Sequence, residues 1–292
     1  MKLKKLFHAG TGVHVNRSPA GTFLIFLILL AVSAFLMLPF VYSVLQSLKP
    51  MEELFAFPPQ FFVRNPTGEN YRKLLQLTNS LWVPFSRYVF NSVFVTVIGT
   101  LVYVVIASMA AYPLALGHFR GAGVVNEVVV NALLFSGPVL VVAQYIIMAK
   151  TNMLNTYQAM ILPTLAAPLG LFLMRQFMVQ IVPASVIEAA KIDGAGTFTI
   201  FWRIVMPMVK PAWLTLIIFT FQTLWSGAGA NYIYNESLKV LPTVVGQIAA
   251  GGVARAGVGA AAAVVLMVPP IVIFLLAQRN VMETMATSGI KD

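Results

Sequence analysis

The chain has 292 residues, of which 59% are hydrophobic and only 10% are charged, whereas an ordinary soluble domain carries about 25% charged residues. This composition excludes a soluble domain of this size. The 19 Lys and Arg residues outnumber the 9 acidic residues, but they are scattered between apolar blocks, which argues against a nucleic-acid partner and for a role in membrane topology.

Six long stretches lack Asp, Glu, Lys and Arg and are dominated by Leu, Ile, Val, Phe and Ala. A bilayer core is about 30 Å thick, so a helix of about 20 apolar residues crosses it. Burying one charge at mid-membrane costs about 2.5 to 3.5 kcal/mol, so membrane spans avoid charged residues. Six charge-free runs separated by charged clusters are hard to explain by chance. We therefore predict an all-α membrane protein with six transmembrane helices, in the runs 18–48, 88–119, 128–149, 151–174, 211–235 and 256–278.

The N-terminal tail, residues 1–20, is basic and holds no acid. Its basic side chains are Lys2, Lys4, Lys5 and Arg17. Such a bias places the tail in the cytoplasm and makes 21–47 the first transmembrane helix. A cleavable signal peptide is the alternative, but the apolar run exceeds the roughly 7 to 15 residues of a signal core. With six spans, the C-terminal tail 281–292 is cytoplasmic as well.

Two segments on the opposite side of the membrane are expected to be external. The first, 48–87, contains the break Phe57-Pro58-Pro59 and polar residues that exclude a further span, so we expect an exposed, partly ordered cap. The second, 236–255, has an apolar middle that is short and interrupted by proline and glycine. We interpret it as an interfacial or re-entrant element at the entry to a pathway.

An internal loop between the fourth and fifth runs, residues 183–207, has the pattern of a helix, a turn and a second helix. Pro183 can open the first helix, and the run from Asp193 to Gly196 tolerates a tight reversal. The second helix is predicted to run from about Thr197 to Met206, where prolines interrupt it. On physical grounds alone, an amphipathic connector lying on the lipid headgroups is favoured over any functional interpretation of this loop.

The same loop matches, with one departure, a pattern of Glu-Ala-Ala, three residues, Gly, nine residues, Ile, any residue and Leu-Pro. In this chain the matching residues are Glu188-Ala189-Ala190, Gly194, Ile204 and Met206-Pro207. The motif resembles that of ABC importer permeases, and Met206 in place of Leu is the one departure. The resemblance implies a type I importer fold, with a core permease domain over 88–280 and a cytoplasmic coupling helix that contacts an ATPase. The coupling residues it implies are Glu188, Ala189, Ala190, Asp193 and Gly194.

Further features resemble the sugar-importer branch of that family. They are Ser47-Leu48-Lys49-Pro50, Phe57-Pro58-Pro59, Asn70-Tyr71, Tyr88 to Thr96, Leu154-Asn155-Thr156-Tyr157 and Met174-Arg175-Gln176-Phe177. The segment after Trp225 departs from the pattern, because relatives usually continue with Asn, an acid and an aromatic residue. The ending over 281–292 is similar to a branch that serves polysaccharide-derived oligosaccharides, which suggests acidic, alginate-like cargo.

The resemblance implies a permease subunit of the bacterial inner membrane that forms half of a translocation pathway for sugars or oligosaccharides. Its implied partners are a second permease, two ATP-binding subunits, an external solute-binding protein and membrane lipid, without nucleic acid. The chain has no Walker A loop, so it is not expected to be an enzyme, and ATP and Mg belong to the partner ATPases. The histidines are isolated and cysteine is absent, so we expect no cofactor or metal site.

Polar and aromatic residues within or beside the spans are candidates for the pathway, because an amide in hydrocarbon is costly unless it faces a partner or water. The candidates are Asn91, Asn131, Gln144, Gln222, Trp225 and Tyr232. Hydrogen bonds between helices and ordinary interfacial aromatic belts explain them equally well. The alternative function is an ion-coupled secondary transporter, which would need ionisable groups near mid-membrane, and the predicted spans lack acids there.

Overall fold

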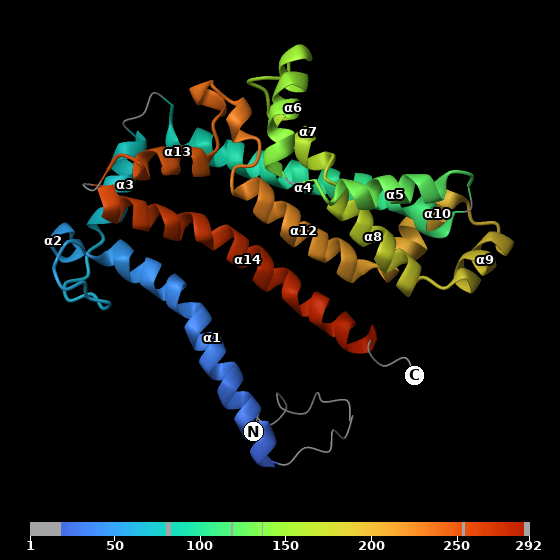
Figure 1. Ribbon diagram of the computed structural model, residues 1–292, viewed down its shortest axis with the longest axis horizontal. Coiled ribbons are helices and arrows are strands. Elements are labelled where there is room, and N and C mark those ends of the chain that lie inside the picture. The colour runs from blue at the N-terminus through green and yellow to red at the C-terminus, as the bar shows by residue number, and fades with distance from the viewer. Residues whose placement is uncertain (1–18, 80–82, 118, 136, 253–254, 289–292) are drawn as a thin grey trace.

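The computed structural model describes residues 19–79, 83–117, 119–135, 137–252 and 255–288. Throughout these ranges the chain forms helices joined by turns and loops, without a β-strand. Figure 1 shows α2 (Met51–Leu54), α3 (Glu69–Asn79) and α13 (Leu241–Ala249) at one end of the molecule. At the other end lie α9 (Ala184–Ile192) and α10 (Thr197–Ile200), and long helices run between the two ends. We call these two ends the cap end and the hairpin end.

Three helices are long and apolar enough to cross a membrane. They are α1 (Pro19–Leu48), α4 (Phe85–Leu116) and α14 (Ala256–Ser288), and the candidate spans within them are Ala20–Leu48, Phe85–Leu116 and Ala256–Gln278. They lie where the sequence predicts its first, second and sixth spans. Helix α1 contacts α14, whereas α4 contacts α8 (Pro168–Ile181) and α12 (Lys210–Trp225).

Bends in the helices lie within or directly before two further predicted spans. The fourth run contains α7 (Tyr157–Leu165) and α8 (Pro168–Ile181), which meet at a bend of 42°. The fifth run begins in α12 (Lys210–Trp225), and the bend of 79° lies just before this run, between α12 and the segment Thr197–Met208. Proline explains the first break, because it lacks an N–H and keeps the preceding residue, here Ala167, out of the helical region (φ −66°, ψ 125°).

The third predicted span is divided into two shorter apolar helices, α5 (Ala122–Ala132) and α6 (Gly137–Lys150). By length and composition, the described residues therefore contain three candidate spans, or up to five if each bent pair counts as one. Hydropathy alone predicted six uninterrupted helices, which the structure does not contain. It reports how readily side chains enter lipid and is insensitive to where the backbone breaks.

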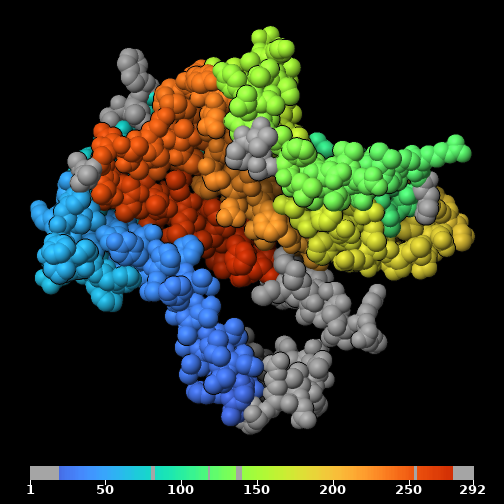
Figure 2. All heavy atoms as spheres, viewed as in Figure 1, coloured from blue at the N-terminus to red at the C-terminus, as the bar shows by residue number. Residues whose placement is uncertain are grey.

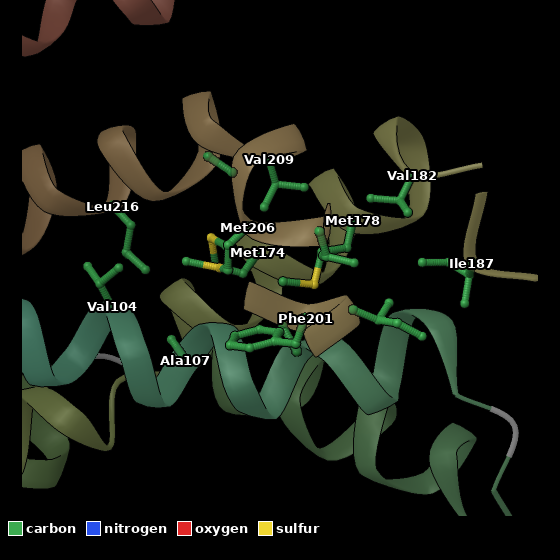
Figure 3. Packing of buried hydrophobic residues seen from close by; sticks show 14 of the residues in the cluster. Val104, Ala107, Met174, Met178, Val182, Ile187, Phe201, Met206, Val209 and Leu216 are labelled. Atoms are coloured by element: carbon green, nitrogen blue, oxygen red, sulfur yellow. The ribbon is translucent and has the colours of Figure 1, made fainter. Parts of the chain in front are cut away.

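The main apolar core lies where α4, α8 and α12 meet the α9–α11 region (Figure 3). Its buried side chains include Val104 and Ala107 from α4, Met174 and Met178 from α8, and Leu216 from α12. A glycine permits the close approach of α4 to α8: a Cβ built on Gly170 would lie 2.5 Å from the Tyr103 hydroxyl oxygen. The core thus fixes the hairpin end to the long helices.

The cap end is built from α2 (Met51–Leu54), α3 (Glu69–Asn79), the 3-10 turns η3 (Ala230–Tyr232) and η4 (Glu236–Leu238), and α13 (Leu241–Ala249). Helix α13 buries Leu241, Val244, Val245 and Ile248 against a cluster that includes residues of α14. The predicted loop 48–87 and the segment 236–255 therefore both hold short helices, which lie at the same end of the molecule.

Candidate functional site

The hairpin at 183–209 contains the predicted loop 183–207, in which the motif lies. Helix α9 (Ala184–Ile192) follows Pro183, and α10 (Thr197–Ile200) follows a turn at Gly194. Gly194 has φ of 78°, a left-handed conformation that glycine adopts without the penalty a side chain would bring. The turn is closed by the N–H of Ala195, which donates to the carbonyl of Ala190 at 2.9 Å. The predicted helix, turn and helix are confirmed.

The second helix of the hairpin runs further than the sequence predicts. It continues from α10 through a π-helical stretch, η2 (Phe201–Val205), and through α11 (Met206–Met208) before the chain bends at Val209. The predicted end at about Met206 is thus displaced by two residues, and the chain bends by 79° between Pro207 and Pro211, the two prolines that predicted the interruption. Pro207 stands in the first turn of α11, after the change of hydrogen-bond pattern, where a missing N–H costs little.

The exposed face of the hairpin combines carboxylates with apolar side chains. Glu188, Ala189 and Asp193 are exposed. Ile192 and Phe198 are 86% and 66% exposed, which is costly for such large apolar side chains in water. Apolar and acidic groups gathered at the tip of a well-packed hairpin are typical of a surface that a protein partner covers.

Ala190 is oriented differently from the other predicted coupling residues. It is buried together with Ile187 and packs into the main core, so it helps hold α9 against the long helices. A groove of about 540 Å³ lies between α9 and the ends of α4 and α8, and Glu188 and Lys191 are among its lining residues. The hairpin therefore presents Glu188 beside a groove and keeps Ala190 inside.

The hairpin is also tied to the ends of the long helices. Arg175 of α8 donates from Nε to the carbonyl of Leu114 near the end of α4, at 3.2 Å. Because α8 leads through Pro183 directly into α9, this bond fixes the base of the hairpin. A displacement of α9 would thus be transmitted to α8 and α4.

Asn91, a candidate for the pathway, is buried at the cap end and its polar atoms contact the chain itself. Its amide nitrogen donates to the carbonyls of Ser237 and Lys239, both at 2.9 Å. Its amide oxygen accepts from the Tyr157 hydroxyl at 2.7 Å. Asn91 thereby joins α4 to η4 and α7, so its polar atoms hold the fold together.

The other pathway candidates do not converge on one place. Tyr232 donates to the Gln144 Oε1 atom at 3.0 Å, which joins η3 to α6. The Trp225 indole donates to the Leu266 carbonyl at 2.9 Å and lies parallel to the Phe221 ring. Asn131 and Gln222 are exposed.

Gln222 lines an apolar cavity of about 380 Å³ between α1, α12 and α14. Phe40, Met267 and Phe274 are among its other walls. Within the described ranges, His, Asp and Glu residues form no group of three that could hold a metal ion.

Two tyrosines that were not among the predicted site residues occupy central positions. Tyr103 donates to the Ala167 carbonyl at 2.7 Å and accepts from the Gly170 N–H at 2.8 Å, across the break between α7 and α8. Tyr157 contacts Asn91 and also accepts from Arg87 at 3.3 Å. Tyr157 stands in one of the features that resemble sugar-importer permeases, whereas no local pattern distinguishes Tyr103.

Comparison with known proteins gives concordant results. The family model described as "Binding-protein-dependent transport system inner membrane component" matches residues 12–286. Protein LplC of Bacillus subtilis (strain 168) is 32% identical over 214 residues, covering 71% of this chain and 68% of that protein. Polygalacturonan/rhamnogalacturonan transport system permease protein YtcP of the same organism is 30% identical over 227 residues, covering 74% of this chain and 73% of that protein.

Among solved structures, the fold is similar to a chain in the crystal structure of a bacterial ABC transporter involved in the import of the acidic polysaccharide alginate. The TM-score is 0.75, with 20% sequence identity, and the match covers 90% of this chain and 98% of that chain. At this identity the likeness concerns the fold.

Proposed function

Because this chain belongs to the family of binding-protein-dependent transport system inner membrane components, we propose that it forms one half of the translocation pathway of an ATP-driven importer of sugars or oligosaccharides. The observation that carries the proposal is the hairpin at 183–209. Its tip exposes Glu188, Ile192 and Phe198 on a base that packs firmly into the core. Such a surface suits an ATPase partner that supplies the energy for transport.

The cargo class is supported by the relatives. YtcP is named for polygalacturonan and rhamnogalacturonan transport, and the solved relative belongs to an importer of alginate. Polygalacturonan and alginate are acidic polysaccharides, so acidic oligosaccharides are the finer proposal for this chain. The ion-coupled alternative lacks support, because the three candidate spans contain no acidic residue.

The proposed assembly contains a second permease, two ATP-binding subunits and an external solute-binding protein. ATP and Mg would be bound by the ATP-binding subunits. ATP-driven movement of the ATPases would displace α9, and the continuous path from α9 through α8 to α4 would carry that displacement to the long helices. A two-state element biased by both ATP and cargo is what alternating access requires.

We further propose six membrane crossings, with both termini in the cytoplasm. The segment holding α5 and α6 would provide the crossing that is missing from the five candidate spans, because it connects the two ends of the molecule. It begins after Gly117, near the Leu114–Arg175 contact at the hairpin end. It ends near Asn155, whose side chain accepts from the N–H groups of Tyr234 and Asn235 at the cap end.

The proposal is tested by measuring ATP hydrolysis in proteoliposomes that contain this chain with its neighbouring permease, ATPase and binding protein. We expect stimulation that requires the binding protein and one class of oligosaccharide. Acidic oligosaccharides should stimulate more than neutral ones if the finer proposal holds. If no ATPase co-purifies and no sugar has an effect, the importer proposal fails.

A charge reversal at Glu188 tests the coupling surface. Glu188→Lys is expected to abolish uptake while leaving membrane insertion intact, because the residue is exposed and its side chain leaves the core undisturbed. Glu52→Lys, an equally drastic change at an exposed carboxylate of α2, is the matched control and should retain uptake. Normal uptake by Glu188→Lys would contradict the role of the hairpin.

A further inference from the structure

The cap end carries a loop of four phenylalanines, residues 55–62, whose side chains are exposed although its backbone is held in place. We call it the phenylalanine loop. Phe57 is 94% exposed and Phe62 is 73% exposed, and Phe55 and Phe61 are exposed as well. Leaving so much aromatic surface in water is costly, since burying one such side chain is worth about 1.5 to 3 kcal/mol. A surface of this kind indicates a partner.

The loop is fixed from three directions. Buried Lys49 donates from its ammonium group to the carbonyl of Gln60. The Glu53 carboxylate accepts from the N–H groups of Arg64 and Asn65, at 3.1 and 2.8 Å. The N–H of Thr67 donates to the Leu48 carbonyl at 2.8 Å, which returns the chain to the end of α1. The exposure of the phenylalanines is therefore a property of an ordered loop.

The position of the loop along α1 points to its partner. The Phe61 ring packs on Tyr42 of α1, with ring centroids 5.7 Å apart. Tyr42 precedes the last residue of α1, Leu48, by a distance of about 9 Å along the axis. A helix as long as α1 covers about 45 Å, which equals a whole bilayer with its headgroups, so Tyr42 lies near the boundary between hydrocarbon and headgroups.

The surface of α1 beside the loop is apolar and open. None of the most apolar window of α1 is buried within the molecule, and Figure 2 shows that the helix stands away from the other helices over much of its length. The phenylalanine loop continues this apolar surface at its cap end, and Arg64 adds an exposed cation beside Phe62. Exposed phenylalanines combined with a cation are typical of segments that lie at the boundary between headgroups and acyl chains.

We infer that the phenylalanine loop is an interfacial anchor, which inserts Phe57 and Phe62 into the headgroup region of the leaflet at the cap end of α1. Arg64 is placed to contact lipid phosphate. The anchor would fix the height of the cap end above the membrane, so that the exposed surfaces of α3 and α13 stay at a constant distance from the lipid. The inference rests on α1 being a membrane span and requires no assumption about cargo.

The absence of cysteine from the sequence makes a direct test possible, because each single-cysteine variant has one reactive thiol. Phe57→Cys and Phe62→Cys are labelled with an environment-sensitive fluorophore and reconstituted with the partner subunits in phosphatidylcholine–phosphatidylglycerol nanodiscs. Spin-labelled lipids then quench the fluorophore according to depth. Gly68→Cys is the matched control in water, because the position is exposed and a Cβ there meets nothing within 4 Å. Leu36→Cys, exposed in the middle of α1, is the control within the membrane.

We expect headgroup-labelled lipid to quench the probes at positions 57 and 62 at least about twofold more than the probe at position 68. Lipid labelled deep in the acyl chain should quench the probe at position 36 most. Two results would overturn the inference. One is quenching of the probes at 57 and 62 as weak as that at 68, and the other is a probe environment that becomes shielded from water only when the binding protein is added. If position 36 is not quenched, α1 is not surrounded by lipid and the anchor is excluded as well. None of these readouts depends on transport, so they are independent of whether sugar is the cargo.

Discussion

Asn91 illustrates how a polar residue in an apolar helix can be mistaken for a ligand-binding group. An amide in hydrocarbon needs partners, and the partners of Asn91 are two carbonyls and a hydroxyl of its own chain. A sequence pattern indicates the need for partners but does not identify them. Asn91 is therefore expected to contribute mainly to the stability of the fold rather than to ligand binding.

Removal of this amide tests that role. Asn91→Ala leaves the carbonyls of Ser237 and Lys239 and the Tyr157 hydroxyl without their partner, and should lower the free energy of unfolding by about 2 to 4 kcal/mol. Tyr157→Phe removes one of these bonds and should cost about 1 kcal/mol. Thermal unfolding in detergent measures both. Loss of uptake by Asn91→Ala with unchanged thermal stability would instead assign the residue to the pathway.

Glu53 makes the phenylalanine loop sensitive to acid. The N–H of Arg64, which donates to the carboxylate, is the largest cause that holds the pKa of Glu53 below its ordinary value of 4.5. A carboxyl group with a lowered pKa stabilises the folded loop above its ordinary pKa, and this contribution is lost as pH falls through the lower, folded value.

A spin label at Phe62→Cys reports this transition. Its mobility should stay constant from neutral pH down to about pH 4.5 and rise only below it. In the Glu53→Gln background the label should be more mobile at neutral pH, because a neutral amide oxygen is a weaker acceptor than a carboxylate. Equal mobility in both backgrounds at neutral pH would show that Glu53 does not hold the loop.

At the scale of elements, the break between α7 and α8 is the feature on which packing depends most. A broken helix in a membrane leaves backbone groups without partners unless another group supplies them. The Tyr103 hydroxyl bonds both the Ala167 carbonyl and the Gly170 N–H, and Gly170 leaves room for it. The bend thus depends on one side chain from a neighbouring helix.

Tyr103→Phe should lower the free energy of unfolding by about 1 to 3 kcal/mol, because two backbone groups at the break lose their partner. Gly170→Ala should have a similar effect, since its new Cβ would displace the hydroxyl. The double variant should cost less than the sum of the two, which thermal unfolding can establish. Tyr112→Phe is the control, because the ring of Tyr112 packs on Phe201 of the same core. Full additivity would indicate that the two residues act separately.

At the scale of the whole molecule, the number of crossings can be tested by asking whether two positions lie on the same side of the membrane, because an odd number of crossings between them places them on opposite sides. Between Gly68 and Gly196 the chain passes through α4, the α5–α6 segment, and the bent pair α7 and α8. If α5 and α6 provide a crossing, these glycines lie on opposite sides of the membrane, and if they do not, on the same side. Both positions are open, since a Cβ at either meets nothing within 4 Å.

Labelling of Gly68→Cys and Gly196→Cys with an impermeant maleimide measures this directly. We expect position 68 to react in intact cells and position 196 to react only after the membrane is opened. The cysteine-free parent chain is the blank. Reaction of both cysteines in intact cells would contradict six crossings and leave α5 and α6 on one side.

The sequence by itself determined that the chain enters a membrane, where α1, α4 and α14 lie, and that 183–207 forms a helix, a turn and a second helix. These features are local: apolar length, the first-turn preference of proline, and the left-handed conformation at Gly194. The resemblance of the motif at 188–207 to importer permeases indicated the family to which the chain belongs.

Only the tertiary structure decided which predicted spans are broken, that Ala190 packs inward beside the exposed Glu188, and that Asn91 and Tyr103 bond the chain itself. The physical reason is that hydropathy measures the transfer of side chains into lipid one residue at a time. Whether a backbone break or a buried amide is tolerated depends on partners distant in the sequence, such as Tyr103 for Gly170 and Ser237 for Asn91.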